Sequence, residues 1–170
     1  MIKHKKGFTI IELIVVIAII AVLAGIVLVN VQGYMAKAKN AKRNSDIASY
    51  VKAFQIYYTD NGKFPFDEPG AELDCCLGSF GGGGCIYGSS TFPECTQTNE
   101  SIKKYLASLP VTIDLVTGNG STSNAYYLQQ NDGNYEIIWW LAGRDQNCGI
   151  ANSLAWFDNS GTQCTYRFSL

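Results

Sequence analysis

The side chains that most enzymes use are scarce in this chain of 170 residues. The one histidine, His4, precedes a long apolar run, so the rest of the chain has no imidazole for base catalysis. Ser101 and Lys104 have S-x-x-K spacing, but the S-D-N and K-T-G companions of that motif are missing. Glycines 81–84 lack the Lys-Ser/Thr that completes a phosphate-binding loop. These residues do not predict an enzyme.

Cysteines are the second group that could do chemistry, and all six follow the apolar run. They are Cys75, Cys76, Cys85, Cys95, Cys148 and Cys164. The first four do not form the paired C-x-x-C clusters of a zinc site, so we expect no metal and no cofactor. Disulfides in an extracytoplasmic domain are the expected alternative. The two adjacent cysteines should take different partners, but six cysteines allow 15 connectivities and the spacing does not choose among them.

Glu12 is a carboxylate within the most apolar part of the sequence. In residues 8–29 only Thr9, Glu12 and Gly25 interrupt Leu, Ile, Val and Ala, and roughly 20 such residues suffice for a helix to cross a bilayer. A carboxylate there costs about 2.5–3.5 kcal/mol on insertion scales, so a plain membrane tether does not explain it. Glu12 should therefore have a partner or a function.

An ordinary cleaved secretory signal also fits poorly. The apolar run is longer than the usual 7–15 residues and contains an acid. The Ala-x-Ala sequence nearest its end is A-K-A at residues 36–38, which is distant and carries a lysine. We expect the run to be retained.

The residues around Glu12 resemble the processing signal of type IV prepilins and type II secretion pseudopilins. They read K-K-G-F-T-I-I-E-L-I from Lys5 to Ile14, which is a basic leader, then Gly, Phe, three residues, Glu and an apolar helix. The resemblance implies that a membrane-embedded prepilin peptidase cuts between Gly7 and Phe8 and methylates the new amine of Phe8. It also implies that Glu12 acts in methylation and in subunit recruitment.

The predicted cleavage would give Glu12 a charged partner. The new amine of Phe8 is a cation one helical turn away, so the carboxylate could pair with it or with the amine of a neighbouring, staggered subunit.

The basic cluster at residues 37–43 offsets the leader lysines, so charge alone does not orient the segment in the membrane. The processing signal and the downstream cysteines place the N-terminus inside.

A helix over residues 8–59 is predicted to carry this N-terminal segment. No proline occurs between Val31 and Pro65, and D-N-G at residues 60–62 is a helix stop. One face of the helix should cover a sheet with side chains spaced by four, three and four residues, namely Ile47, Val51, Phe54 and Tyr58. The stretch 57–65 resembles the end of the long helix of pilins and pseudopilins, and residues 101–110 resemble their short second helix.

The later part of the sequence predicts an antiparallel sheet. Residues 125–130, 135–141 and 163–170 are rich in strand formers and are separated by turn residues. The pairs Tyr126-Tyr127 and Trp139-Trp140 should each put one ring inward, into the core, and one outward. By resemblance, Cys148 and Cys164 are positioned like the C-terminal disulfide loop of many pilins.

The expected fold is α+β, a long N-terminal helix with its upper half packed on an antiparallel sheet and with disulfide-stapled loops. The expected regions are a cleaved leader (1–7), a transmembrane and filament-core helix (8–31) and an extracytoplasmic pilin-like domain (32–170). Beyond the leader the charge is negative and no basic stripe with interleaved aromatics appears, so no nucleic-acid partner is predicted.

The resemblance implies a structural subunit of a type IV pilus or type II secretion-like filament. Its partners would be further copies, other pilins or pseudopilins, the prepilin peptidase and methyltransferase, and the assembly platform protein with its ATPase machinery. It would begin as a single-pass protein of the inner membrane and then enter a pilus or periplasmic filament. The alternative is a monomeric, membrane-tethered binding domain outside the cytoplasm.

Overall fold

The computed structural model describes residues 7–78, 85–110, 116–118, 121–123, 125–151, 153–157 and 161–168. Several predicted features lie outside these ranges, namely residues 1–6 of the leader, glycines 81–84, and the last two residues of the predicted strand 163–170. The chain forms two compact units, residues 1–38 and 39–170. Each unit is described by itself.

Helix α1 runs from Ile10 to Asn61, which confirms the predicted long helix to within two residues at each end. It ends where predicted because Gly62 has a φ of 73°, in the left-handed region that favours glycine. The Gly62 N–H donates to the carbonyl oxygen of Tyr58 at 2.8 Å and so satisfies one of the last free carbonyls of the helix.

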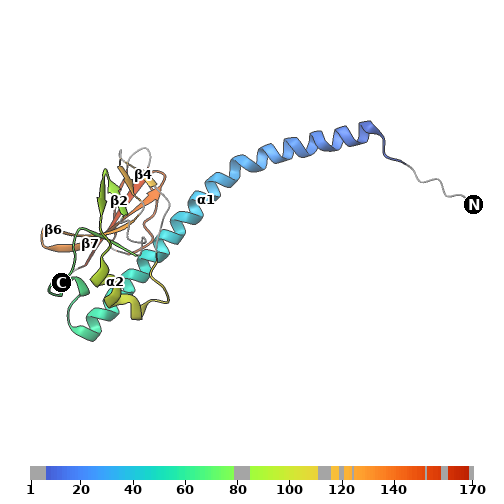
Figure 1. Cartoon of the computed structure of the whole chain (residues 1–170). Coiled ribbons are helices and arrows are strands. Elements are labelled where there is room, and N and C mark those ends of the chain that lie inside the picture. The colour runs from blue at the N-terminus through green and yellow to red at the C-terminus, as the bar shows by residue number, and fades with distance from the viewer. Residues whose placement is uncertain are drawn as a thin grey trace, which may run out of the picture. The chain divides into compact units, whose positions relative to one another are not determined.

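The second unit contains a five-stranded antiparallel sheet (Figure 1). Its strands, in spatial order, are β1 (Cys75–Leu77), β6 (Tyr126–Asn131), β7 (Asn134–Ala142), β9 (Gly161–Phe168) and β8 (Ser153–Phe157). The predicted strands correspond to β6, β7 and β9. Asp132 and Gly133 join β6 to β7 with φ of 48° and 79°, as a two-residue hairpin turn requires.

A second, four-stranded sheet consists of short strands in the order β3-β2-β5-β4. Their bounds are β2 (Cys85–Gly88), β3 (Ser90–Phe92), β4 (Val116–Gly118) and β5 (Ser121–Ser123). Each has only three or four residues, too few to show a clear alternation of polar and apolar side chains, and the sequence did not predict them.

The short second helix lies earlier than predicted. Helix α2 covers Thr96–Ile102, a 3-10 turn (η2) covers Lys103–Tyr105, and Leu106 is extended, so the prediction of a helix over 101–110 was wrong in position. Helix α2 begins directly after Cys95, because the carbonyl oxygen of Cys95 accepts the first helical hydrogen bond, from the N–H of Asn99 at 2.8 Å. A further 3-10 turn, η1, covers Pro65–Asp67.

The main core lies between the C-terminal part of α1 and one face of the five-stranded sheet. It contains Ile47, Tyr50 and Phe54 from the helix and Tyr126, Leu128, Ile137, Trp139 and Leu141 from the strands. Ile47, Val51 and Phe54 are buried as predicted, but Tyr58 is exposed and Tyr57 takes the buried place in the last turn. The inward rings of the two aromatic pairs are Tyr126 and Trp139, and both are core residues as predicted.

The opposite face of the sheet carries a second, smaller core. Tyr127 and Ile138 pack there with Cys76, Cys85 and Ala125. Tyr87 of β2 stacks on Tyr127 with ring centroids 4.4 Å apart. The outward rings Tyr127 and Trp140 are therefore buried, because the second sheet covers part of the face that a single-sheet fold would leave in solvent.

Polar contacts fix residues 39–61 of α1 against the sheet. Asn40 accepts the N–H of Ala142 at 2.9 Å and donates to the carbonyl of the same residue at 2.8 Å. Asn44 accepts the indole N–H of Trp139 and donates to the carbonyl of Asn147, both at 2.9 Å. These bonds satisfy polar groups that apolar packing would leave unpaired. They also fix the register of the helix against the sheet.

Three disulfides staple the second unit. They join Cys75 to Cys95, Cys76 to Cys85, and Cys148 to Cys164. The adjacent cysteines thus have different partners on opposite faces of the five-stranded sheet, because Cys75 belongs to the main core and Cys76 to the smaller one.

Candidate functional site

The start of α1 is closed by a reciprocal set of hydrogen bonds between Thr9 and Glu12. The Glu12 carboxylate accepts the backbone N–H and the hydroxyl of Thr9, both at 2.8 Å and both through Oε2. In return the Thr9 hydroxyl oxygen accepts the backbone N–H of Glu12 at 3.3 Å. Since α1 begins at Ile10, Thr9 is the N-cap residue and Glu12 is the third helical residue, and together they form a capping box.

Thr9 is a residue of this candidate site that was not predicted from the sequence. The signal was present, because T-x-x-E directly before an apolar run is typical of a capping box. The capping box gives Glu12 a local partner before any proteolysis. Glu12 Oε1, however, has no hydrogen-bond partner among residues 7–78 or the other described segments, so the carboxylate can still accept an ammonium group.

Gly7 and Phe8 precede the helix and are exposed, Phe8 to 87%. A Cβ built at Gly7 meets no heavy atom within 4 Å, and the Gly7 φ does not lie in the left-handed region. Neither packing nor backbone conformation therefore requires glycine at this position. Both residues are accessible at the surface of the described chain.

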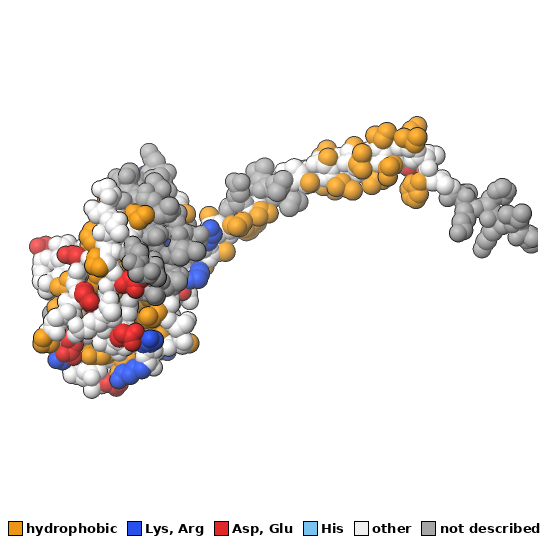
Figure 2. All heavy atoms as spheres, in the orientation of Figure 1, with side chains coloured by type: hydrophobic (Ala, Val, Ile, Leu, Met, Phe, Trp, Pro, Cys, Tyr) orange, Lys and Arg blue, Asp and Glu red, His pale blue; other side chains and the backbone are white. Residues whose placement is uncertain are grey.

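The first part of α1 is apolar on every side. Between Ile10 and Ile26 the large aliphatic side chains are all exposed, including the five consecutive residues Leu13 to Ile17. Figure 2 shows these apolar side chains following the helix in an almost unbroken line. A helix that is apolar around its circumference is not stable facing water and is normally covered by lipid or by other helices.

Among the residues that the structure describes, no helix combines the length and the apolarity that crossing a membrane requires.

Comparison with known proteins supplies independent information on the same segment. The profile of the prokaryotic N-terminal methylation motif matches residues 2–28, which include Gly7, Phe8, Thr9 and Glu12. Among solved structures, none is a significant match.

Three curated relatives show the range of similar proteins. The type II secretion system core protein G of Pectobacterium carotovorum subsp. carotovorum is 42% identical over 67 residues, which is 39% of this chain and 43% of the relative. The protein of the same name from Escherichia coli (strain K12) is 41% identical over 68 residues, 40% of this chain and 47% of the relative. The fimbrial protein EcpC of Eikenella corrodens is 40% identical over 69 residues, 41% of this chain and 45% of the relative.

The chain thus spans less than half the length of each of these relatives. Their names denote a secretion-system core protein and a fimbrial protein, and neither is the name of an enzyme. The resemblance predicted from residues 5–14 is confirmed by the motif match and by these similarities.

Proposed function

We propose that this chain is a structural subunit of a type IV pilus or type II secretion-like filament, because its N-terminal segment matches the methylation motif and is similar to type II secretion core protein G and to a fimbrial protein. A prepilin peptidase would cleave it between Gly7 and Phe8 and methylate the amine of Phe8. The observation that carries the proposal is the capped and exposed start of an apolar helix directly after an exposed glycine.

The surroundings of Gly7 support recognition by a peptidase. Glycine is unnecessary for the fold at this position, since a side chain there would meet nothing. The fold does not need glycine at position 7, directly before the predicted cut. Its presence there is best explained as a requirement of the active site of the peptidase. The Thr9 N–H belongs to the Phe8–Thr9 peptide bond, so the capping box would survive the cut after Gly7.

The geometry of Glu12 supports a role in polymerisation. Thr9 occupies Oε2, which leaves Oε1 for the N-terminal amine of Phe8 from the same or a neighbouring subunit. A charged hydrogen bond in apolar surroundings is stronger than a neutral one. Helix capping and amine pairing can therefore use the same carboxylate at the same time.

The apolar circumference of α1 supports the proposed locations. Before assembly, residues 8–31 would lie in the inner membrane with the N-terminus on the cytoplasmic side and the disulfide-bonded unit outside. After assembly the same surface would pack against other helices. Ile19, Val22 and Leu23 are each more than half exposed on this surface, so they are available to contact apolar side chains of a neighbour.

The proposed partners follow from this scheme. They are further copies of this chain, other pilins or pseudopilins, the prepilin peptidase and methyltransferase, and the assembly platform with its ATPase. The test is to shear filaments from cells with and without the peptidase and to identify this chain in them. A chain found only as an uncut monomer in the membrane would contradict the proposal.

A further inference from the structure

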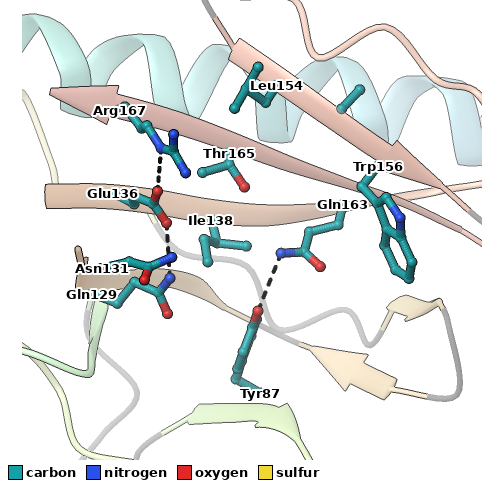
Figure 3. A pocket seen from close by; sticks show the side chains of 11 residues that line it. Tyr87, Gln129, Asn131, Glu136, Ile138, Leu154, Trp156, Gln163, Thr165 and Arg167 are labelled. Atoms are coloured by element: carbon teal, nitrogen blue, oxygen red, sulfur yellow. Dashed lines mark hydrogen bonds and ion pairs between the residues drawn. The ribbon is translucent and has the colours of Figure 1, made fainter. Parts of the chain in front are cut away.

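A pocket of about 300 Å³ lies on the face of the five-stranded sheet that is opposite α1 (Figure 3). Its floor is formed by side chains of β7 and β9, while Tyr87 of β2 borders one side and Trp156 of β8 another. The volume is at the lower end of the roughly 300–1,000 Å³ typical of small-molecule sites, so a ligand would be about the size of one sugar ring.

The charges in this pocket cancel. The charged residues among its described lining residues are Glu136 and Arg167, which form an ion pair. Glu136 is only 2% exposed and also accepts the side-chain amide of Gln129 at 3.0 Å. A buried carboxylate held by two donors is fixed by the fold. Because the Glu136–Arg167 pair has no net charge, the pocket favours a ligand without net charge.

The remaining polar groups can both donate and accept hydrogen bonds. The amide of Gln163 donates to the hydroxyl oxygen of Tyr87 at 3.4 Å, which leaves the Tyr87 hydrogen and the Gln163 oxygen without a partner among the described residues. Burial, together with the Glu136 carboxylate, raises the pKa of Tyr87 and keeps its hydroxyl protonated. Asn131 and Thr165 likewise make no side-chain hydrogen bond to another described residue.

Trp156 supplies a flat apolar surface beside these polar groups. It is 53% exposed, whereas Trp139 and Trp140 are buried, and its neighbour across the strand pair is Gln163. Leu154 lines the same pocket and is also more than half exposed. No packing within the described part of the chain accounts for these two apolar side chains at the rim of a polar hollow.

We propose that this pocket binds a neutral sugar residue, with one apolar face of the ring on Trp156 and its hydroxyl groups on Gln163, Tyr87 and Thr165. A sugar hydroxyl donates and accepts, which matches amide and hydroxyl side chains. The C–H face of the ring matches an exposed indole, whose apolar area is otherwise in water. The inference does not depend on the chain being a filament subunit.

The test is saturation-transfer NMR on the full chain in a detergent whose head group is not a sugar. The probes are the methyl glycosides of glucose, galactose, N-acetylglucosamine and N-acetylgalactosamine, with glucuronate and glucosamine as charged comparators. At least one neutral probe should receive saturation, strongest at the protons of one ring face. Trp156→Ala should weaken its binding by about tenfold or more, and Gln163→Ala by a similar factor.

The matched control is Phe157→Ala, which removes the next aromatic residue of β8, one that does not line the pocket. This variant should bind the sugar as the unchanged chain does, and Trp156→Phe should retain most of the binding. The proposal is overturned if no neutral probe binds, if charged comparators bind equally well, or if Trp156→Ala and Phe157→Ala behave alike. Unchanged unfolding midpoints for all four variants would exclude loss of the fold as the cause.

Discussion

Oxygen Oε2 of Glu12 accepts two hydrogen bonds from Thr9, at 2.8 Å each, while Oε1 has no hydrogen-bond partner in the described part of the chain. The Glu12 carboxylate therefore caps the start of the helix and can still bind a cation. The sequence suggested that the charge of Glu12 would have no partner until proteolysis exposed an amine. The structure gives it a local partner first and leaves room for the second.

Two variants of Glu12 separate capping from charge. Glutamine can replace glutamate in a capping box, so Glu12→Gln should keep the helix start while losing the negative charge. Glu12→Val should lose both. If amine pairing drives assembly, both variants should insert into the membrane normally and enter filaments poorly, as measured by the amount of chain in sheared filaments relative to membranes.

Thr9→Val is the complementary variant because it removes the cap and keeps the charge. Loss of an N-cap threonine costs about 0.5–2 kcal/mol of helix stability, which should appear as fraying of the first turn in hydrogen exchange. Incorporation into filaments should remain near normal. A Glu12→Gln chain that assembles fully, beside a Thr9→Val chain that does not, would show that Glu12 acts only as a cap.

Gly7→Val should stop processing and leave the fold unchanged. A side chain at Gly7 contacts nothing within 4 Å in this chain, so the unfolding midpoint should not move. A peptidase site that accepts only a small residue before the cut would exclude valine. The chain should accumulate with Met1 to Gly7 attached, as measured by its intact mass; efficient cleavage of the variant would contradict the assigned role of Gly7.

Asn44→Ala should destabilise the second unit by about 1–3 kcal/mol. The substitution leaves the indole N–H of the fully buried Trp139 and the carbonyl of Asn147 without their partner. The neighbouring Ser45→Ala is the control, because Ser45 is exposed and should change stability by less than about 0.5 kcal/mol. Equal urea midpoints for the two variants would refute the importance of this contact.

The ion pair of Lys63 with Glu68 predicts a component of acid sensitivity. The hydrogen bond from Lys63, at 2.7 Å, and that from Tyr57 hold the pKa of Glu68 below its ordinary value of 4.5. Because the folded pKa is the lower one, the stabilisation is complete above the ordinary value and is lost as the pH falls through the folded pKa. The stability difference between the unchanged chain and Glu68→Gln should therefore shrink on acidification, and a difference that is constant down to low pH would exclude this linkage.

Features with a strong local pattern could be predicted from the sequence. The length of α1 follows from the absence of proline, and its end follows from the left-handed conformation of Gly62. The three longest strands follow from strand-forming residues between turns. The exchange of Tyr57 for Tyr58 in the core shows the limit of periodicity. A spacing of three and a spacing of four both fit a period of 3.6. In the structure the buried Tyr57 packs edge-on against Tyr105, whereas Tyr58 contacts Phe64 and stays exposed.

Features that depend on contacts between distant parts of the sequence could not be predicted. The strands β2 to β5 are too short to show a pattern, and they exist where the disulfide Cys76–Cys85 and the stacking of Tyr87 on Tyr127 bring segments together. The proposed sugar pocket needs β2, β6, β7, β8 and β9 to be adjacent, and its residues form no motif along the chain. The capping box of Thr9 and Glu12, in contrast, was a local pattern that could have been recognised.

The measurement that tests the central claim most directly is intact and fragment mass spectrometry of this chain from purified filaments. The account predicts a chain that begins at Phe8, with a methylated amine, and that is found in filaments only when the peptidase is present. A chain in cells that still begins at Met1 and is never recovered with other copies of itself would contradict it.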